Sequence, residues 1–191
     1  MHWKTPKFFG REQELRWIHD HLEGHKFCRK VLAICGLSGL GKTQLVLHYW
    51  NKQMREFSSM LWIDATSYQT ALDSFEHVAI ELGGASALKS PLQYVKRWLS
   101  SPSNQNWLMI IENVIDLDGD FRVQELIPSC EHGAVIVTST QSSTGKAIDA
   151  ETLELSEIDS KAGAQILTSR FKSPASAQEC KREGNPNTWR S

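Results

Sequence analysis

Eight consecutive residues carry the clearest chemical signal in the chain, Gly36-Leu37-Ser38-Gly39-Leu40-Gly41-Lys42-Thr43. They fit G-x-x-x-x-G-K-[ST], the phosphate-binding loop or P-loop. In such a loop glycines let backbone N–H groups point inward at a phosphate. Lys42 is then placed to bind the β- and γ-phosphates, and the Thr43 hydroxyl is available to Mg²⁺. The alternative is a plain glycine-rich turn with an exposed lysine.

The flanking residues decide between these two interpretations. Val31–Cys35 is a short apolar run of the kind expected for a buried parallel strand. Gln44–Met54 contains neither Gly nor Pro and is expected to be helical. A helix that begins near Gly41 would add free N–H donors and the positive end of its dipole. Strand, loop and helix in this order predict a nucleotide-phosphate site.

A second pair of polar residues follows another apolar run, Trp107–Ile111. Glu112 ends that run and is the candidate carboxylate for Mg²⁺, which P-loop enzymes hold at the end of a neighbouring strand; a surface carboxylate is the alternative. Asn113 stands where many P-loop ATPases have an acid that activates water. Because an amide cannot take a proton, and general-base assistance is worth about 10²–10⁴ in rate, we expect slow or absent hydrolysis.

Two further polar clusters are weaker candidates. Thr138-Ser139-Thr140 ends a strand with hydroxyls that either reach a γ-phosphate or cap the strand. Asp116-Leu117-Asp118-Gly119-Asp120 lacks the spaced acids and the closing Glu of a calcium loop, so we interpret it as a turn.

The elements that must position these residues alternate along the chain. Alternating strands and helices predict an α/β fold, a P-loop NTPase three-layer αβα sandwich with a mainly parallel five-stranded sheet. Ligands of such sheets bind beyond the carboxyl ends of the strands, where the P-loop, Asp64, Glu112-Asn113 and Thr138-Ser139-Thr140 gather. The expected strands are 31–35, 60–64, 107–111, 133–138 and 152–155. The expected helices are 12–24, 44–54, 67–82, one from the Ser90–Gln93 capping box with Pro91 first, a short one near 121–126, and one to 171 that Ser156-x-x-Asp159 opens. Residues 141–145 are expected to form a polar loop.

The composition of the chain and of its segments limits the domain organisation and the classes of partner. Residues 1–28 are predicted to form an N-terminal lead and helix, 29–171 the nucleotide-binding domain, and 172–191 a polar, disordered tail. The net charge is −1 without a basic run, so we expect no nucleic-acid partner. The four cysteines form no C-x-x-C pair, and no apolar run is long enough for a membrane span. We therefore expect a soluble, cytoplasmic protein with no membrane partner.

The order of the motifs resembles the NB-ARC domain of the STAND NTPases, especially fungal NLR-like receptors. The resemblance rests on Phe8–Glu12, the P-loop, Leu61–Ala65, Trp107–Asn113 and Gly133–Ser139. It implies ADP or ATP with Mg²⁺ at a signalling switch of innate-immunity type, with Glu112 in the Walker B place and Thr43 as a further metal ligand. It also places Phe9, Gly10 and Arg11 near the adenine, although the residues alone favour Phe8 and Phe9 as a hydrophobic anchor. The implied nucleotide contacts are Phe9, Gly10, Arg11, Gly36, Leu37, Ser38, Gly39, Leu40, Gly41, Lys42, Thr43 and Gln44.

The chain departs from the family pattern at two positions. The family usually has Asp in the place of Glu112, and Arg in the place of Thr140 to sense the γ-phosphate. The ARC helical and winged-helix motifs do not follow, which we interpret as truncation before those parts. The sequence leaves three hypotheses for the function. The first is a nucleotide switch that forms homotypic oligomers or binds a full-length receptor; the second is an active P-loop ATPase; the third is a degenerate fragment that acts as an interaction module.

Overall fold

The computed structural model describes residues 8–83, 89–114 and 122–171. Its described part falls into two compact units, the P-loop unit from Arg11 to Glu157 and a second unit made of residues 8–10 and 158–171. The helix α6 (Ser160–Phe171) belongs to this second unit, and the domain range 29–171 stays a prediction. Its buried Ala162 packs close to Gly10 of its own unit, and its Leu167 is exposed. The predicted turn at 116–120 and the tail from 172 lie outside the described residues.

Five parallel strands form the sheet of the P-loop unit, in the order β2-β3-β4-β1-β5. The predicted α/β fold is confirmed, and every strand pair in the described sheet is parallel. The three interior strands β3, β4 and β1 are buried over most of their length, as strands covered on both faces must be. The strands are β1 (Lys30–Cys35), β2 (Ser59–Asp64), β3 (Trp107–Val114), β4 (Ala134–Ser139) and β5 (Glu151–Glu154).

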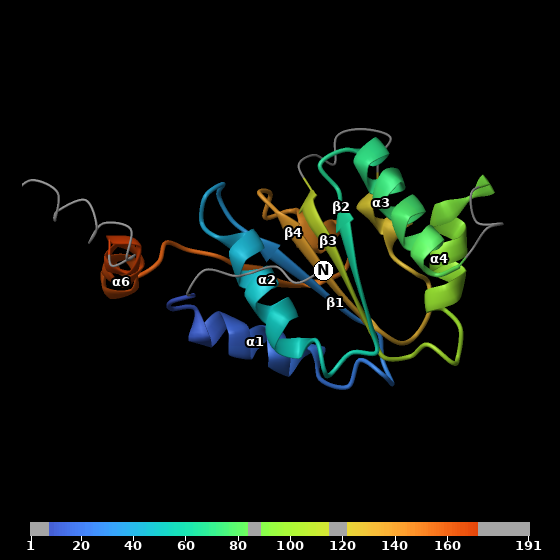
Figure 1. Ribbon diagram of the computed structural model, residues 1–191, viewed down its shortest axis with the longest axis horizontal. Helices are drawn as coiled ribbons and strands as arrows, with labels where there is room; N and C mark the ends of the chain where they lie inside the picture. The colour runs from blue at the N-terminus through green and yellow to red at the C-terminus, as the bar shows by residue number, and fades with distance from the viewer. Residues whose placement is uncertain (1–7, 84–88, 115–121, 172–191) are drawn as a thin grey trace, which may run out of the picture. The chain divides into compact units, whose positions relative to one another are not determined.

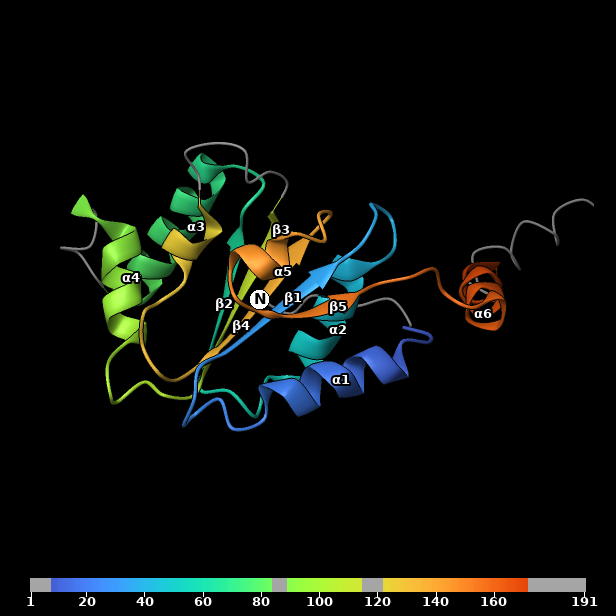
Figure 2. The same cartoon turned by 180° about the vertical axis from the view of Figure 1, so that it is seen from behind.

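Helices cover both faces of this sheet (Figure 1). The first face carries α1 and α2, and the opposite face carries α3, α4 and the 3₁₀ helix η2 (Figure 2). The described helices of the unit are α1 (Glu12–Leu22), α2 (Lys42–Gln53), α3 (Tyr68–Glu81), α4 (Pro91–Leu99), η2 (Val123–Leu126) and α5 (Thr144–Ala147). None of the helices in the described ranges has the length and apolar character that a membrane crossing requires.

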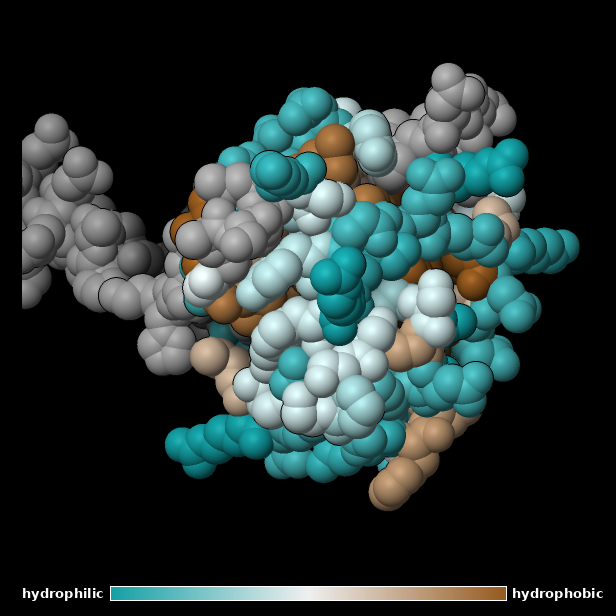
Figure 3. All heavy atoms as spheres, turned by 90° about the vertical axis from the view of Figure 1, so that its right-hand side faces the viewer, coloured by the Kyte–Doolittle hydropathy of each residue, from teal (hydrophilic) through white to brown (hydrophobic). Residues whose placement is uncertain are grey.

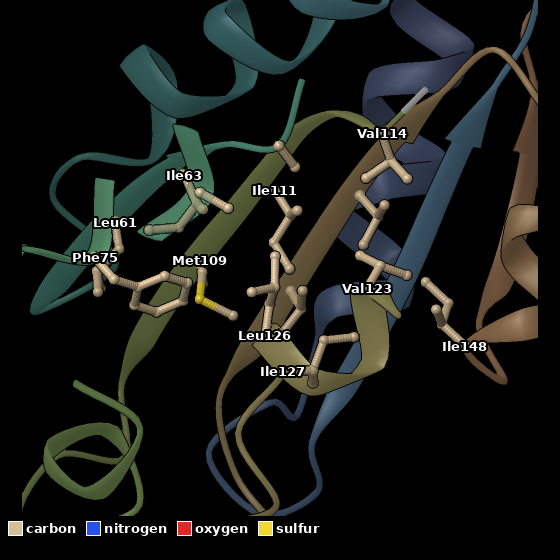
Figure 4. Packing of buried hydrophobic residues seen from close by; sticks show 14 of the residues in the cluster. Leu61, Ile63, Phe75, Met109, Ile111, Val114, Val123, Leu126, Ile127 and Ile148 are labelled. Carbon is tan, nitrogen blue, oxygen red and sulfur yellow. The ribbon is translucent and has the colours of Figure 1, made fainter. Parts of the chain in front are cut away.

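The larger core lies between the sheet and the α3–α4 layer (Figure 4). Leu61 and Ile63 of β2 and Met109 and Ile111 of β3 point into it, and Phe75 of α3 lies beside Leu61 and Met109. Alternate residues of these strands therefore face the α1–α2 side, because successive side chains of a strand point to opposite faces. The outer surface seen from the α4 side is mostly hydrophilic or neutral, with apolar residues in small separate groups (Figure 3).

Local signals in the sequence were right for some helix ends and wrong for others. Ser67 caps α3 in a capping box with Thr70, but Ser90 makes no side-chain cap at α4, where its ψ of 74° departs from an extended cap. Asp159, and not Ser156, accepts the capping hydrogen bond of α6, from the backbone N of Ala162 at 2.8 Å.

The segment predicted as a polar loop after β4 also differs from the expectation, since it contains the short helix α5. The buried Thr144 hydroxyl donates to Ser139 Oγ at 2.8 Å. A tertiary contact of this kind leaves no periodic pattern in the sequence.

Candidate functional site

The P-loop joins β1 to α2 at the carboxyl edge of the sheet, as the sequence predicts. Lys42, the first residue of α2, folds back over the loop, and its Nζ donates to the carbonyls of Gly36 at 2.7 Å and Leu37 at 2.9 Å. Burial lowers the pKa of Lys42 from its usual value, while nearby Cys35 and Glu112 act in the opposite direction. The ammonium is therefore held within the loop, where an incoming phosphate could replace the two carbonyls.

Gly36 fixes the start of the loop. Its φ is 148°, and a Cβ at this position would lie 2.7 Å from the carbonyl O of Leu155. The backbone of Leu155 is in turn tied to β1, because its N donates to the Cys35 carbonyl at 2.7 Å. A glycine is thus required where the loop passes the segment that follows β5.

The side chains of Thr43, in the first turn of α2, and Glu112, near the end of β3, are in contact. The Thr43 hydroxyl donates to Glu112 Oε1 at 2.5 Å, and both side chains are partly buried. A hydroxyl and a carboxylate are oxygen ligands of the kind Mg²⁺ takes, so the pair fits the predicted metal site. The described residues hold no group of three or more His, Cys, Asp or Glu that could bind a metal, so phosphates and water would complete the shell.

Asn113 sits in a bulge at the end of β3. Its φ is 65°, and the register of β3 against β4 shifts between Ile111 and Val114. Asn is one of the few residues that tolerate this left-handed conformation. Its backbone N donates to Thr138 Oγ1 at 2.8 Å, and its side-chain Nδ2 donates to Thr66 Oγ1 at 3.3 Å. Asn113 is therefore a hydrogen-bond donor in the rim of the sheet.

The hydroxyls at the end of β4 are engaged with β3. Thr138 and Ser139 are buried; the first accepts from the Asn113 backbone, and the second donates to the Val114 carbonyl at 2.8 Å. These bonds correspond to the strand-capping alternative of the sequence analysis. Thr140, in the place where the family has Arg, is exposed.

Arg11 touches the P-loop from the other side. Its guanidinium is buried and donates to Glu14 Oε1 at 2.7 Å, to the Leu40 carbonyl at 3.3 Å and to the Ser156 carbonyl at 2.5 Å. The link to Ser156 spans 145 positions and has no signal in the sequence. Phe9 and Gly10 belong to the second unit, and their contact with adenine stays a prediction.

The remaining predicted contacts lie on the loop and the first turn of α2. Leu37, Ser38, Gly39 and Gln44 are exposed, and Leu40 and Gly41 are partly exposed. The structure thus brings the P-loop, Lys42, Thr43 and Glu112 together in one site. Thr66, which links Asn113 to Asp64, was missed by the sequence analysis because a lone Thr after a strand carries no specific signal.

The chain is similar in sequence to a curated protein. The chain is 30% identical over 123 residues to a nucleotide-binding leucine-rich repeat (NLR)-like protein of Hyaloscypha variabilis. The match covers 60% of this chain and spans only 12% of that relative. No protein-family model matches the chain.

Solved structures give a likeness of fold. Cdc6p of Pyrobaculum aerophilum superposes with a TM-score of 0.63 at 16% identity, over 88% of this chain and 51% of that one. The Drosophila ORC bound to DNA has a TM-score of 0.58 at 14% identity, over 87% and 47% of the two chains. The fold is that of a P-loop NTPase, and the findings agree with the resemblance to an NB-ARC-like P-loop domain.

Proposed function

We propose that this chain is the adenine-nucleotide-binding switch module of an NB-ARC-type STAND receptor, with weak or no hydrolysis. The observation that carries the proposal is the closed P-loop, in which Lys42 is held by loop carbonyls beside the Thr43–Glu112 pair. The NLR-like relative supports the receptor context, and the fold neighbours support a nucleotide-binding P-loop.

The chain's own groups account for binding of the phosphates. Lys42 exchanges its two loop carbonyls for phosphate oxygens, which carry more negative charge and form stronger hydrogen bonds. The amino end of α2 adds N–H donors and its dipole, since Gly41 provides no side-chain cap there. Mg²⁺, when bound through Thr43 and Glu112, would neutralise phosphate charge.

Weak turnover follows from the residue beside Glu112. Asn113 donates its amide to Thr66 and carries no group that accepts a proton from water. A bound triphosphate would therefore be hydrolysed slowly, as expected for a nucleotide-dependent switch and not for an ATPase of high turnover. We propose no nucleic-acid partner, because the net charge is −1.

The test is to identify and titrate the nucleotide. Mass spectrometry of the denatured purified protein should release ADP or ATP, and calorimetry of the emptied protein should show binding of both. At a concentration of about 100 times Kd, a ligand stabilises the fold by about 2.7 kcal/mol. Absence of any thermal shift with ADP, ATP and Mg²⁺ at millimolar concentration would refute the proposal.

A further inference from the structure

We infer that this chain hydrolyses ATP slowly, and that Asp64, in place of the residue beside Glu112, is the carboxylate that accepts the proton of the attacking water. The inference rests on the proposed nucleotide site. Asp64 ends β2, directly opposite Glu112 of β3 in the register of the sheet. Neighbouring strands lie about 4.8 Å apart, so the two carboxyl residues stand side by side at the rim.

The two side chains lie on the same face of the sheet. Leu61 and Ile63 of β2 point into the α3–α4 core (Figure 4), so Trp62 and Asp64 point to the opposite side. Trp62 confirms this direction, because its ring packs edge-on against Trp50 of α2 with centroids 5.7 Å apart. Asp64 thus projects on the α2 side, where the Thr43–Glu112 pair is located.

A short hydrogen-bond chain orients this carboxylate. Oδ1 of Asp64 accepts from the Thr66 backbone N at 3.0 Å and from the Thr66 hydroxyl. The Thr66 hydroxyl in turn accepts from Asn113 Nδ2 at 3.3 Å. An amide at position 113 can make this donation and a carboxylate cannot. Asn113 is therefore a positioning residue that acts on Asp64 through Thr66.

The second oxygen remains to accept from water. In the part of the chain that the structure describes, the hydrogen bonds of the Asp64 carboxylate all use Oδ1, and the side chain is exposed. Oδ2 takes one proton from the water as its oxygen forms a bond to Pγ. The bond between Pγ and the β–γ bridging oxygen breaks, and its electron pair leaves with ADP. Exposure then lets Asp64 release the proton to solvent.

The experiment compares Asp64→Asn with wild type in single-turnover hydrolysis of ATP and in binding. We expect hydrolysis to fall by about 10²-fold or more, the usual value of general-base assistance, while the Kd for ADP changes less than about twofold, within the ±0.5 kcal/mol usual for a surface substitution. Binding of ADP with aluminium fluoride, which imitates the transferring phosphoryl group, should weaken in the variant. Asp73→Asn, a matched change of an exposed carboxylate on α3, should leave all three measurements unchanged.

Thr66 provides a second measurement. Thr66→Val removes the hydroxyl that joins Asn113 to Asp64, so kcat should fall while KM stays constant, and Thr66→Ser should restore kcat. A role of Thr66 in folding alone would move the unfolding midpoint and leave kcat of the folded protein intact.

Three outcomes overturn the inference. If the Asp64→Asn variant hydrolyses ATP at the wild-type rate and still binds ADP, Asp64 is not the proton acceptor, while the proposed nucleotide site is unaffected. Wild-type hydrolysis no faster than that of Lys42→Ala also excludes it. Failure of the wild type to bind either nucleotide would instead refute the proposed function on which the inference depends.

Discussion

The hydroxyl of Thr43 donates to the carboxylate of Glu112 at 2.5 Å, which joins the first turn of α2 to the end of β3. The helix α2 follows β1, and β4 lies between β1 and β3 in the sheet. The bond thus brings together two oxygen groups from sequence positions 69 apart. A metal ion arriving with a nucleotide would find both ligands already in place.

Glu112→Gln should reduce the Mg²⁺-dependent part of ATP binding. The neutral amide oxygen is a weaker ligand for a hard cation, and losing an interaction with a charged group costs about 1.5–3 kcal/mol, or about tenfold or more in Kd. Calorimetry with Mg²⁺ and with EDTA separates this term from phosphate binding, which should be unchanged. Glu131→Gln, at an exposed loop position, is the control. An equal Mg²⁺ effect in both variants would contradict the assignment.

Lys42→Met should weaken ATP binding about 10- to 100-fold, because a charge-assisted contact with the phosphates is lost. The folded chain should persist, since the hydrogen bonds of Nζ within the described residues go to the Gly36 and Leu37 carbonyls of its own loop. Lys52→Met changes an exposed lysine of the same helix and should bind normally. Binding by Lys42→Met at wild-type strength would place the phosphates elsewhere.

Lys42 also predicts a pH dependence of stability without nucleotide. Burial lowers its pKa in the fold below 10.5, so the unfolded chain binds this proton more tightly than the folded chain. The free energy of unfolding of wild type, relative to Lys42→Met, should therefore be lowest below the folded pKa and rise as pH increases toward 10.5. Urea unfolding of both proteins from pH 8 to 11 measures the difference. A difference that stays constant, or falls, with pH would be inconsistent with the burial of this ammonium.

Much of the site was predictable because its signals are local. The P-loop spacing, the apolar run before it and the run that ends at Glu112 are each contained in a few consecutive residues. Parallel strands then place their carboxyl ends at one edge, which accounts for the meeting of Thr43 and Glu112.

The parts that escaped prediction depend on contacts between distant positions. The bulge at Asn113 arises from pairing with β4 and from the buried Thr138 hydroxyl, neither of which β3 itself encodes. The engagement of Arg11 with Ser156 joins the two ends of the P-loop unit. Periodicity reports the face of a helix or strand but not which loop it meets.

Arg11→Lys should lower the free energy of unfolding by about 1–3 kcal/mol, because a single ammonium cannot reproduce the guanidinium fork that reaches three acceptors. Arg11→Ala should cost more, since it also leaves the carbonyls of Leu40 and Ser156 without this donor and removes the packing of the buried side chain. Urea unfolding with Arg16→Lys as the exposed control on the same helix measures both. Equal stability of all three variants would show that the buried contacts contribute nothing net.

Gly36→Ala should destabilise the fold far more than Gly39→Ala. Both positions have positive φ, 148° and 84°, which costs a side chain roughly 1–2 kcal/mol. A Cβ at Gly36 would also approach the Leu155 carbonyl to 2.7 Å, whereas at Gly39 nothing lies within 4 Å. Relief of that overlap adds about 1–3 kcal/mol, so urea unfolding should give roughly 2–5 kcal/mol for Gly36→Ala and 1–2 kcal/mol for Gly39→Ala. Equal losses of stability would mean that Gly36 does not pack against the Leu155 backbone. The position of the Gly36 carbonyl, which accepts from Lys42, would then be in question.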